Sequence, residues 1–268
     1  MQFISFNING IRAHQSQVLF IIQSLHPEII GLQEIKTKKE CFPIETFLKY
    51  GYSSYIYGQK QYNGVALLSR IKIQKIFRGL HEYDNRQRRM ITVELKTKKI
   101  KKLLIINIYA PNGESVYNTI KFQEKKLFYY KLYLLLKDYR LKYDNILIMG
   151  DMNISPTDLD IGFSQDIIKK WIILKKCSFL PEERYFIKNL FKLGFIDAFR
   201  YLNPKRNNFY SWFDYRSCGY ENNIGLRIDL FLVTSSLLKY VQSSGILYHL
   251  RLMKKFSDHV PIWIQLNI

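Results

Sequence analysis

Residues 147–155, LIMGDMNIS, change character halfway along. Residues 147–149 are apolar and typical of a buried strand, and Gly150 then leads into Asp151 and Asn153, whose side chains end in oxygen atoms. Polar groups at the end of a core strand cost free energy unless they are hydrogen-bonded or bind a ligand. The stretch therefore predicts a core strand that leads directly into a polar site.

Other short apolar runs resemble this strand. NILIMG extends it back to residue 145, and the other runs lie at residues 3–8, 28–32, 64–69, 90–95, 103–109, 227–233 and 260–266. Helical spacing of apolar residues marks residues 14–25, 117–142 and 181–194, the last beginning with a proline and acidic residues and ending at a glycine. Helices and strands interleave without strict alternation, which predicts an α/β fold with more than one mixed sheet.

The composition is that of a folded protein. Of the 268 residues, 47% are hydrophobic, and the 13 glycines and 7 prolines are scattered rather than grouped into a linker. Without a repeat or a low-complexity tract, we expect residues 1–268 to form one domain.

The chain is strongly basic, with a formal charge of +19. Such a charge favours a polyanionic partner, either nucleic acid or an anionic membrane. A bias toward AT-rich codons also raises the lysine content, so the charge alone does not decide. The run KTKKIKK at residues 96–102 is predicted to be a solvated hairpin.

The cysteines and the N-terminal residues exclude several classes of protein. Cys41, Cys177 and Cys218 are far apart in the sequence, which argues against a zinc site or a disulfide framework and fits a reducing cytoplasm. The first residues, MQFISFNING, do not form a signal peptide, and no apolar run approaches the roughly 20 residues that span a bilayer. We expect a cytoplasmic protein that does not bind membranes.

Several predicted strands begin or end in polar residues. A structural hydrogen bond would explain any one of them, but together they predict a site for a hard divalent cation and an acid–base group. The residues are Asn7, Asn9, Glu34, Tyr109, Asp151, Asn153, Asp229, Asp258 and His259.

These strand ends carry a family resemblance. The ordered motifs FNING, LQE, NIYAPNG, GDMN, RIDL and SDH resemble the endonuclease/exonuclease/phosphatase superfamily, and LIMGDMNISPTDLDIG, KKCSFLPEER, FYSWFDYRS and GLRIDL resemble its exonuclease III branch. The resemblance covers essentially the whole chain. It implies a four-layer α/β sandwich of two packed mixed β-sheets flanked by helices, and phosphodiester cleavage that depends on Mg²⁺, with Mn²⁺ as a possible substitute.

The resemblance also implies roles for individual residues. Asp151 matches the residue that activates water or handles the proton of the leaving group, and Asn153 and Tyr109 would donate hydrogen bonds to the phosphate. Asp229 would orient His259, which would act either as a base or as a charged group that binds the phosphate. The implied metal site consists of Glu34 and Asn7 with Asp258, and Asp151, Asn153 and His259 belong to the same group.

A second set of residues matches positions that contact DNA in the family. Trp212, Phe213 and Leu226 would line a small apolar pocket that accepts a flipped abasic deoxyribose. Candidate phosphate contacts are Lys121, Lys176, Arg216 and Arg227.

The implied activity is DNA repair on duplex DNA with abasic sites or blocked 3′ ends. The family incises 5′ of an abasic site to leave a 3′ hydroxyl, acts as a 3′→5′ exonuclease and removes 3′ phosphates. Two alternatives are an inositol-phosphate or sphingolipid phosphodiesterase on the same fold, and a non-catalytic nucleic-acid-binding protein. The motifs SWFDYRS and CSFLPEER disfavour the first, and the presence of every metal and acid–base position disfavours the second. We expect a monomer.

Overall fold

The computed structural model describes residues 1–80, 87–215, 219–253 and 255–268. The candidate phosphate contact Arg216, the cysteine Cys218 and most of the segment 81–90, for which the sequence predicts no role, lie outside these ranges. None of the described helices is both long and apolar enough to cross a lipid bilayer.

Most described strands belong to two six-stranded sheets. The first sheet has the order β13-β14-β1-β2-β4-β3, the second has the order β5-β6-β7-β8-β12-β9, and β10 and β11 form a separate ribbon. The bounds are β1 (Gln2–Asn7), β2 (Ile29–Gln33), β3 (Ser53–Tyr57), β4 (Val65–Ser69), β5 (Lys75–Arg78), β6 (Met90–Leu95), β7 (Leu103–Tyr109), β8 (Asn145–Asp151), β9 (Phe195–Asp197), β10 (Trp212–Phe213), β11 (Gly225–Leu226), β12 (Asp229–Thr234), β13 (Val241–Ile246) and β14 (Ile262–Leu266).

Each sheet contains one parallel pair. β1 runs parallel to β2, and β7 runs parallel to β8, whereas the other neighbouring strands are antiparallel. Both sheets are therefore mixed, as predicted. The run at residues 96–102 links β6 to β7 with its lysines exposed, which confirms the predicted solvated hairpin.

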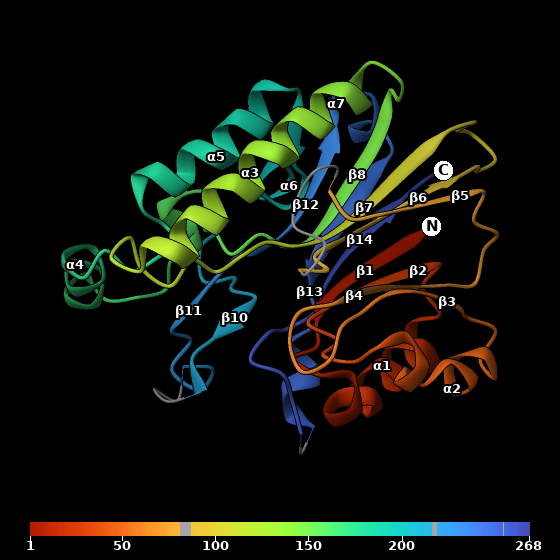
Figure 1. Ribbon diagram of the computed structural model, residues 1–268, viewed down its shortest axis with the longest axis horizontal. Helices are drawn as coiled ribbons and strands as arrows, with labels where there is room; N and C mark the ends of the chain where they lie inside the picture. The colour runs from red at the N-terminus through yellow and green to blue at the C-terminus, as the bar shows by residue number, and fades with distance from the viewer. Residues whose placement is uncertain (81–86, 216–218, 254) are drawn as a thin grey trace.

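Helices cover the outer faces of both sheets (Figure 1). Ile4 and Ile30 of the first sheet pack in one outer core with residues of α1, and Ile106 and Ile148 of the second sheet pack in another with residues of α3 and α5. The helices are α1 (Ile11–Leu25), α2 (Ile44–Leu48), α3 (Thr119–Arg140), α4 (Gln165–Ile173), α5 (Pro181–Lys192), α6 (Ala198–Leu202) and α7 (Ser235–Leu238), with 3₁₀ turns at Lys39–Cys41, Asp158–Asp160 and Tyr248–Leu252.

A third core lies between the sheets. Phe3 and Leu67 of the first sheet meet Ile105 and Phe231 of the second in one buried cluster. Adjacent residues of a strand point to opposite faces, so strands such as β7 are apolar on both sides and read as continuous hydrophobic runs. The four-layer α/β sandwich is confirmed.

One polar contact joins the two sheets across this inner core. The Asn107 side chain donates hydrogen bonds to the backbone oxygens of Leu32 and Ala66, both at 3.0 Å, and accepts one from Gln33 at 2.6 Å. A Cβ atom at Gly31 would lie only 2.8 Å from the Asn107 side-chain oxygen. Glycine at this position therefore lets the sheets approach closely enough for the buried amide to find its partners.

Candidate active site

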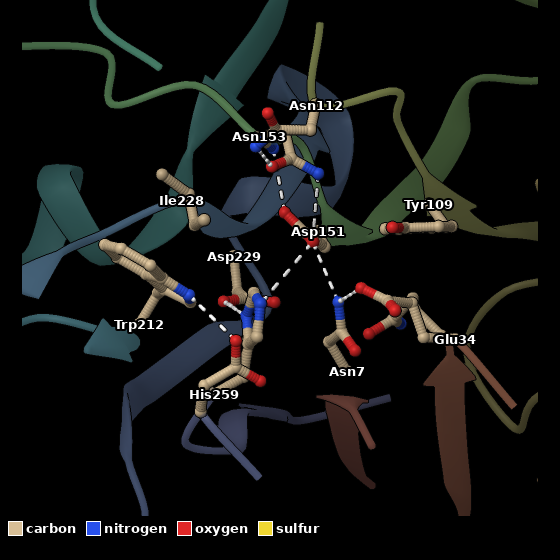
Figure 2. A network of polar contacts seen from close by, with 12 residues as sticks. Asn7, Glu34, Tyr109, Asn112, Asp151, Asn153, Trp212, Ile228, Asp229 and His259 are labelled. Atoms are coloured by element: carbon tan, nitrogen blue, oxygen red, sulfur yellow. Dashed lines mark hydrogen bonds and ion pairs between the residues drawn. The ribbon is translucent and has the colours of Figure 1, made fainter. Parts of the chain in front are cut away.

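Strands from both sheets end at the candidate active site (Figure 2). Asn7 pairs with Gln33 at the ends of the parallel strands β1 and β2, and Glu34 follows directly. Tyr109 pairs with Asp151 at the ends of the parallel strands β7 and β8. Because the carboxyl ends of parallel strands lie at the same edge of a sheet, each parallel pair delivers two polar residues to one place.

Antiparallel neighbours add the remaining groups. Asp229 begins β12 directly opposite Asp151, and residues 258–259 precede β14, which runs antiparallel to β1. Residues at or next to the strand ends of both sheets line a cavity of about 460 Å³. Its walls are formed by Glu34, Tyr109, Asn112, Glu114, Asp151, Asn153, Trp171, Lys176, Cys177, Ser178, Trp212, Ile228, Asp258 and His259.

The Asp151 carboxylate is buried and held by N–H donors. It accepts hydrogen bonds from the Asn7 amide at 2.9 Å, from the Asn153 backbone at 2.8 Å and from the Asn153 side chain at 3.1 Å. Gly150 makes this exit possible, because its φ is +141° and a Cβ atom there would lie 1.9 Å from the Ile108 oxygen. Burial raises the pKa of Asp151 to about 7, although the charge of nearby His259 opposes the shift.

His259 lies between two carboxylates. Its Nδ1 is 2.8 Å from Asp229 Oδ2, and its Nε2 is 3.7 Å from Asp151 Oδ2. Burial alone would lower the pKa of the imidazole, but the charges of Asp229 and Asp151 raise it to about 10. The ring is therefore an imidazolium at neutral pH, with Nδ1–H donating to Asp229.

Glu34 and its neighbours form the opposite side of the site. Glu34 Oε1 accepts a hydrogen bond from the Asn7 amide at 3.0 Å, and Oε2 lies 3.0 Å from the ammonium group of Lys36. Asp258 Oδ1 accepts a hydrogen bond from Asn9 at 2.9 Å. The Asn7 amide thus joins Glu34 to Asp151, and the predicted residues Asn7, Glu34, Asp151 and Asp258 come together.

The donor atoms at this site suit a divalent cation. The carboxylate oxygens of Glu34, Asp151 and Asp258 are hard ligands of the kind that a divalent cation prefers. Carboxylate oxygens of Asp151 and Asp229 and a ring nitrogen of His259 lie within 4.8 Å of one another, and because the charged ring has no lone pair to offer, the carboxylates are the available ligands. Asp229 Oδ1 is buried and has no hydrogen-bond partner among the described residues, so the site has unused acceptor capacity.

The predicted phosphate donors differ in their availability. Burial, followed by the charge of Glu34, raises the pKa of Tyr109 well above its ordinary value, so this residue remains a neutral hydroxyl. Both N–H groups of the Asn153 amide are occupied by protein oxygens, those of Ala110 and Asp151, and its Oδ1 accepts from Asn112 at 2.9 Å. In this arrangement both N–H groups of Asn153 are directed at protein oxygens rather than into the cavity. Asn153 thereby holds Asp151.

The three residues predicted to line an apolar pocket have different positions in the structure. Trp212 lines the cavity and donates from Nε1 to Asp258 at 3.1 Å. Phe213 and Leu226 are buried and are not among the described residues that line it. Neighbouring residues on a strand point to opposite faces, so Phe213 packs with Tyr210 and Val260 in a separate cluster.

Leu226 is buried behind the cavity wall. It pairs with Trp212 across the β10–β11 ribbon and packs in the same cluster as Ile228. Ile228 and Trp171 take the wall positions that the sequence assigned to Phe213 and Leu226.

The predicted basic contacts have different surroundings. Lys176 lines the cavity, with its ammonium group 5.0 Å from the centre of the Trp171 ring. Lys121 is exposed and forms an ion pair with Glu114, which also lines the cavity. Arg227 points into the protein, and a role in contacting phosphate is therefore wrong for it.

Arg227 is 2% exposed and bound by two buried aspartates. Its Nε donates to Asp160 at 2.7 Å, and its Nη2 donates to Asp197 at 2.6 Å. The guanidinium is thus part of the structural framework behind the site.

Sequence reasoning missed several residues of the site. Asn112 and Ile228 lie inside the motifs NIYAPNG and RIDL, so their position at a strand end was a usable signal. Lys36 follows LQE by only one residue, but nothing in its residue type indicates that it would contact Glu34. Trp171 lies on α4 and reaches the site only through the placement of that helix, which the local sequence does not specify.

Comparison with known proteins agrees with this geometry. Residues 4–259 match the Endonuclease/Exonuclease/phosphatase family. Exodeoxyribonuclease III of Haemophilus influenzae is 47% identical over 266 residues, which cover 99% of each chain. An exodeoxyribonuclease of Bacillus subtilis is 28% identical over the full length of both chains.

Solved structures share the fold. A 3′ phosphatase from Neisseria, bound to a product DNA hairpin, superposes with a TM-score of 0.92 and 30% identity over all of both chains. An AP endonuclease from Archaeoglobus fulgidus superposes with a TM-score of 0.89 and 29% identity, also over all of both chains. With its motifs, fold and strand-end site in agreement, the chain belongs to the endonuclease/exonuclease/phosphatase family.

Proposed function

We propose that this chain is a DNA repair nuclease that hydrolyses phosphodiester bonds in duplex DNA. It incises 5′ of abasic sites to leave a 3′ hydroxyl, and at 3′ ends it removes nucleotides and phosphates. The observation that carries the proposal is the buried Asp151, whose raised pKa suits proton transfer near neutral pH, beside the oxygen ligands of Glu34 and Asp258 in one cavity. The 47% identity to an exodeoxyribonuclease III supports it.

The protein's own groups divide the chemistry. Asp151 takes the proton of the attacking water or controls that of the leaving 3′ oxygen. His259, held by Asp229, presents a charged Nε2–H to the phosphate oxygens. The Tyr109 hydroxyl would donate a hydrogen bond to the same group while remaining protonated. These donors stabilise the negative charge that builds up on the phosphate in the transition state.

Glu34, Asn7 and Asp258 would hold a Mg²⁺ or Mn²⁺ ion, with Asp151, Asn153 and His259 in the same site. When bound, the ion supplies Lewis acidity and neutralises charge on the phosphate. The oxygen ligands fit such an ion, and the cavity leaves room for water and substrate.

Cleavage of duplex DNA is expected to require this ion. The test is a strand-cleavage assay on a duplex with one abasic site, with and without Mg²⁺. EDTA should abolish the nick, and Glu34→Ala should raise the metal concentration for half-maximal activity by more than about tenfold, because a ligand is lost. Glu28→Ala is the matched control, since Glu28 precedes β2 and pairs with Arg70 away from the cavity. Full activity in EDTA would refute metal dependence.

We assign to Trp212 the discrimination between an abasic site and an intact base pair. A basic protein attracts any duplex, with an affinity that falls as salt rises, but charge cannot distinguish an abasic site from an intact pair. An abasic nucleotide is cheaper to flip, because it has no base to unpair or unstack. It would then fit the wall formed by Trp212 and Ile228 and place its 5′ phosphate near Asp151.

Trp212→Ala is expected to lower abasic incision by about tenfold or more while leaving affinity for undamaged duplex nearly unchanged. Single-turnover cleavage and titration of an intact duplex measure the two quantities separately. Trp212→Phe is the matched variant, because it keeps an apolar wall but removes the N–H donor to Asp258. Wild-type incision by Trp212→Ala, or a nick on the 3′ side of the lesion, would remove this assignment.

Further proposals concern the number of domains, the binding partner and the oligomeric state of the protein. Residues 1–268 form a single domain, supported by the inner core that both sheets share and by the site to which both contribute. The partner is double-stranded DNA rather than a membrane. The protein acts as a monomer in the cytoplasm, where its substrate is located.

A further inference from the structure

A buried lysine on α3 lies behind the cavity. The Lys125 side chain is fully buried, and none of its atoms lines the cavity. Its Nζ donates to Glu183 Oε1 at 2.5 Å and to the backbone oxygens of Asn112 and Asn153, both at 2.9 Å. All three N–H groups of the ammonium are thus used.

The partners of Lys125 belong to three separate segments of the site. Asn112 follows β7, and Asn153 follows β8. Glu183 lies in α5, where its Oε2 accepts from the backbone of Ser178 at 2.8 Å and of Leu180 at 2.9 Å. Ser178, Asn112 and Asn153 all line the cavity. One ammonium group therefore ties together three walls.

The contact to Asn153 leads directly to the catalytic carboxylate. Lys125 holds the Asn153 backbone oxygen, and Asn153 in turn donates its backbone and side-chain N–H groups to Asp151. On the other wall, a Cβ atom at Gly113 would lie 2.9 Å from Lys125 Cδ and 3.0 Å from Cys177 Sγ. The lysine, the Asn112–Gly113 turn and the segment that begins at Cys177 are closely packed.

Stability alone does not explain a buried ion pair at this place. The free energy needed to remove a lysine and a glutamate from water is about as large as the free energy gained from their attraction. Apolar side chains of similar size would therefore stabilise the fold as much as this ion pair does. Backbone oxygens from two separate loops, however, need a donor with several N–H groups, and a single ammonium supplies them.

We propose that Lys125 is a positioning residue for the hydrolysis reaction. Its ammonium group fixes Asn153, and through it Asp151, at a set distance from the Asn112 and Ser178 walls. The inference rests on the proposed nuclease function. The position of the Asp151 carboxylate then depends on the buried Lys125 ammonium group, which does not contact DNA.

The first test compares two adjacent lysines of α3. Lys125→Met should lower the single-turnover incision rate by about 10²-fold, since a small misplacement of a catalytic group has an effect of this size. The dissociation constant for duplex DNA should remain within about twofold, because the side chain is buried. Lys126→Met is the matched control: Lys126 pairs with Glu182 at 2.7 Å, but both side chains are solvent-exposed. Equal rates for the two variants would overturn the proposal.

The second test separates positioning from stability. Adding Glu183→Gln to Lys125→Met removes the unpaired buried charge, so the free energy of unfolding should return toward that of the wild type. The incision rate should stay low, because the Asn112 and Asn153 oxygens still lack their donor. Recovery of the rate together with stability would show a structural role only and reject the positioning role.

The third test does not depend on nuclease activity. In a protein that carries Cys41→Ser and Cys218→Ser, the remaining Cys177 is buried and packs near Lys125. Lys125→Met should raise its rate of reaction with a thiol reagent by about tenfold, through local opening of the wall. An unchanged thiol rate would contradict the proposal even if the wild type did not cleave DNA. A wild type without cleavage would instead reject the proposed function.

Discussion

Replacing Asp151 with asparagine is expected to lower the single-turnover rate of abasic incision by about 10²- to 10⁴-fold. The side chain keeps its size but can no longer accept a proton. Its carboxylate receives three hydrogen bonds from N–H donors, which fix its direction toward the cavity. Affinity for duplex DNA should change little, because Asp151 is buried and does not contribute to the positive surface. Filter binding or anisotropy gives the affinity, and rapid quench gives the rate.

The pH profile provides a second observation on the same residue. Burial raises the pKa of Asp151 to about 7, so a base at this position is protonated below that pH. The wild-type rate should therefore fall as pH decreases through the pKa of Asp151, approaching about tenfold per unit well below it. Asp151→Asn should lose this limb. His259 has a pKa raised to about 10 and stays charged across the same range. An unchanged rate in the variant would remove Asp151 from the mechanism.

Sequence patterns predicted the central elements and missed the edges. β6 and β7 occupy residues 90–95 and 103–109 as expected, because strands buried on both faces are continuously apolar. β3 and β13, with the sequences SSYIY and VQSSGI, were not predicted. Both are edge strands of the first sheet, where exposure allows polar residues and removes the hydrophobic signal.

The same limit applies to the site. Polar residues at the ends of core strands could be recognised from the sequence, because burying a polar group without a partner costs free energy. The structure brings three of them, Asn7, Glu34 and Asp151, together. Which face a residue takes in the short β10–β11 ribbon depends on the register of two-residue strands, so Phe213 was assigned to the wrong side. Arg227 was misassigned for a related reason. Its partners Asp160 and Asp197 are 67 and 30 residues away in the sequence.

Arg227→Met is expected to lower the free energy of unfolding by about 3–5 kcal/mol, which is a large fraction of the stability of a typical domain. Methionine has a comparable length, so packing is partly kept. The loss arises because Asp160 and Asp197 remain buried without the cation that bridges them. The Arg200 guanidinium still pairs with Asp160. Its only contact with the Asp197 carboxylate among the described residues is a hydrogen bond from the Arg200 backbone N–H. Urea denaturation at neutral pH measures the difference.

Two comparisons separate this effect from a general effect of removing an arginine. Arg70→Met breaks an exposed pair with Glu28 and should cost less than about 1 kcal/mol.

The second comparison is acid titration. Burial alone would raise the pKa of Asp160, but Arg227 and the other donors lower it below its ordinary value. A carboxylate with a lowered folded-state pKa contributes stability above the unfolded pKa of about 3.9, and this contribution is lost as pH falls through the folded value. The gap between wild type and Arg227→Met should therefore narrow below about pH 4. A gap that stays constant on acidification would mean that lost packing, not the buried charges, accounts for the destabilisation.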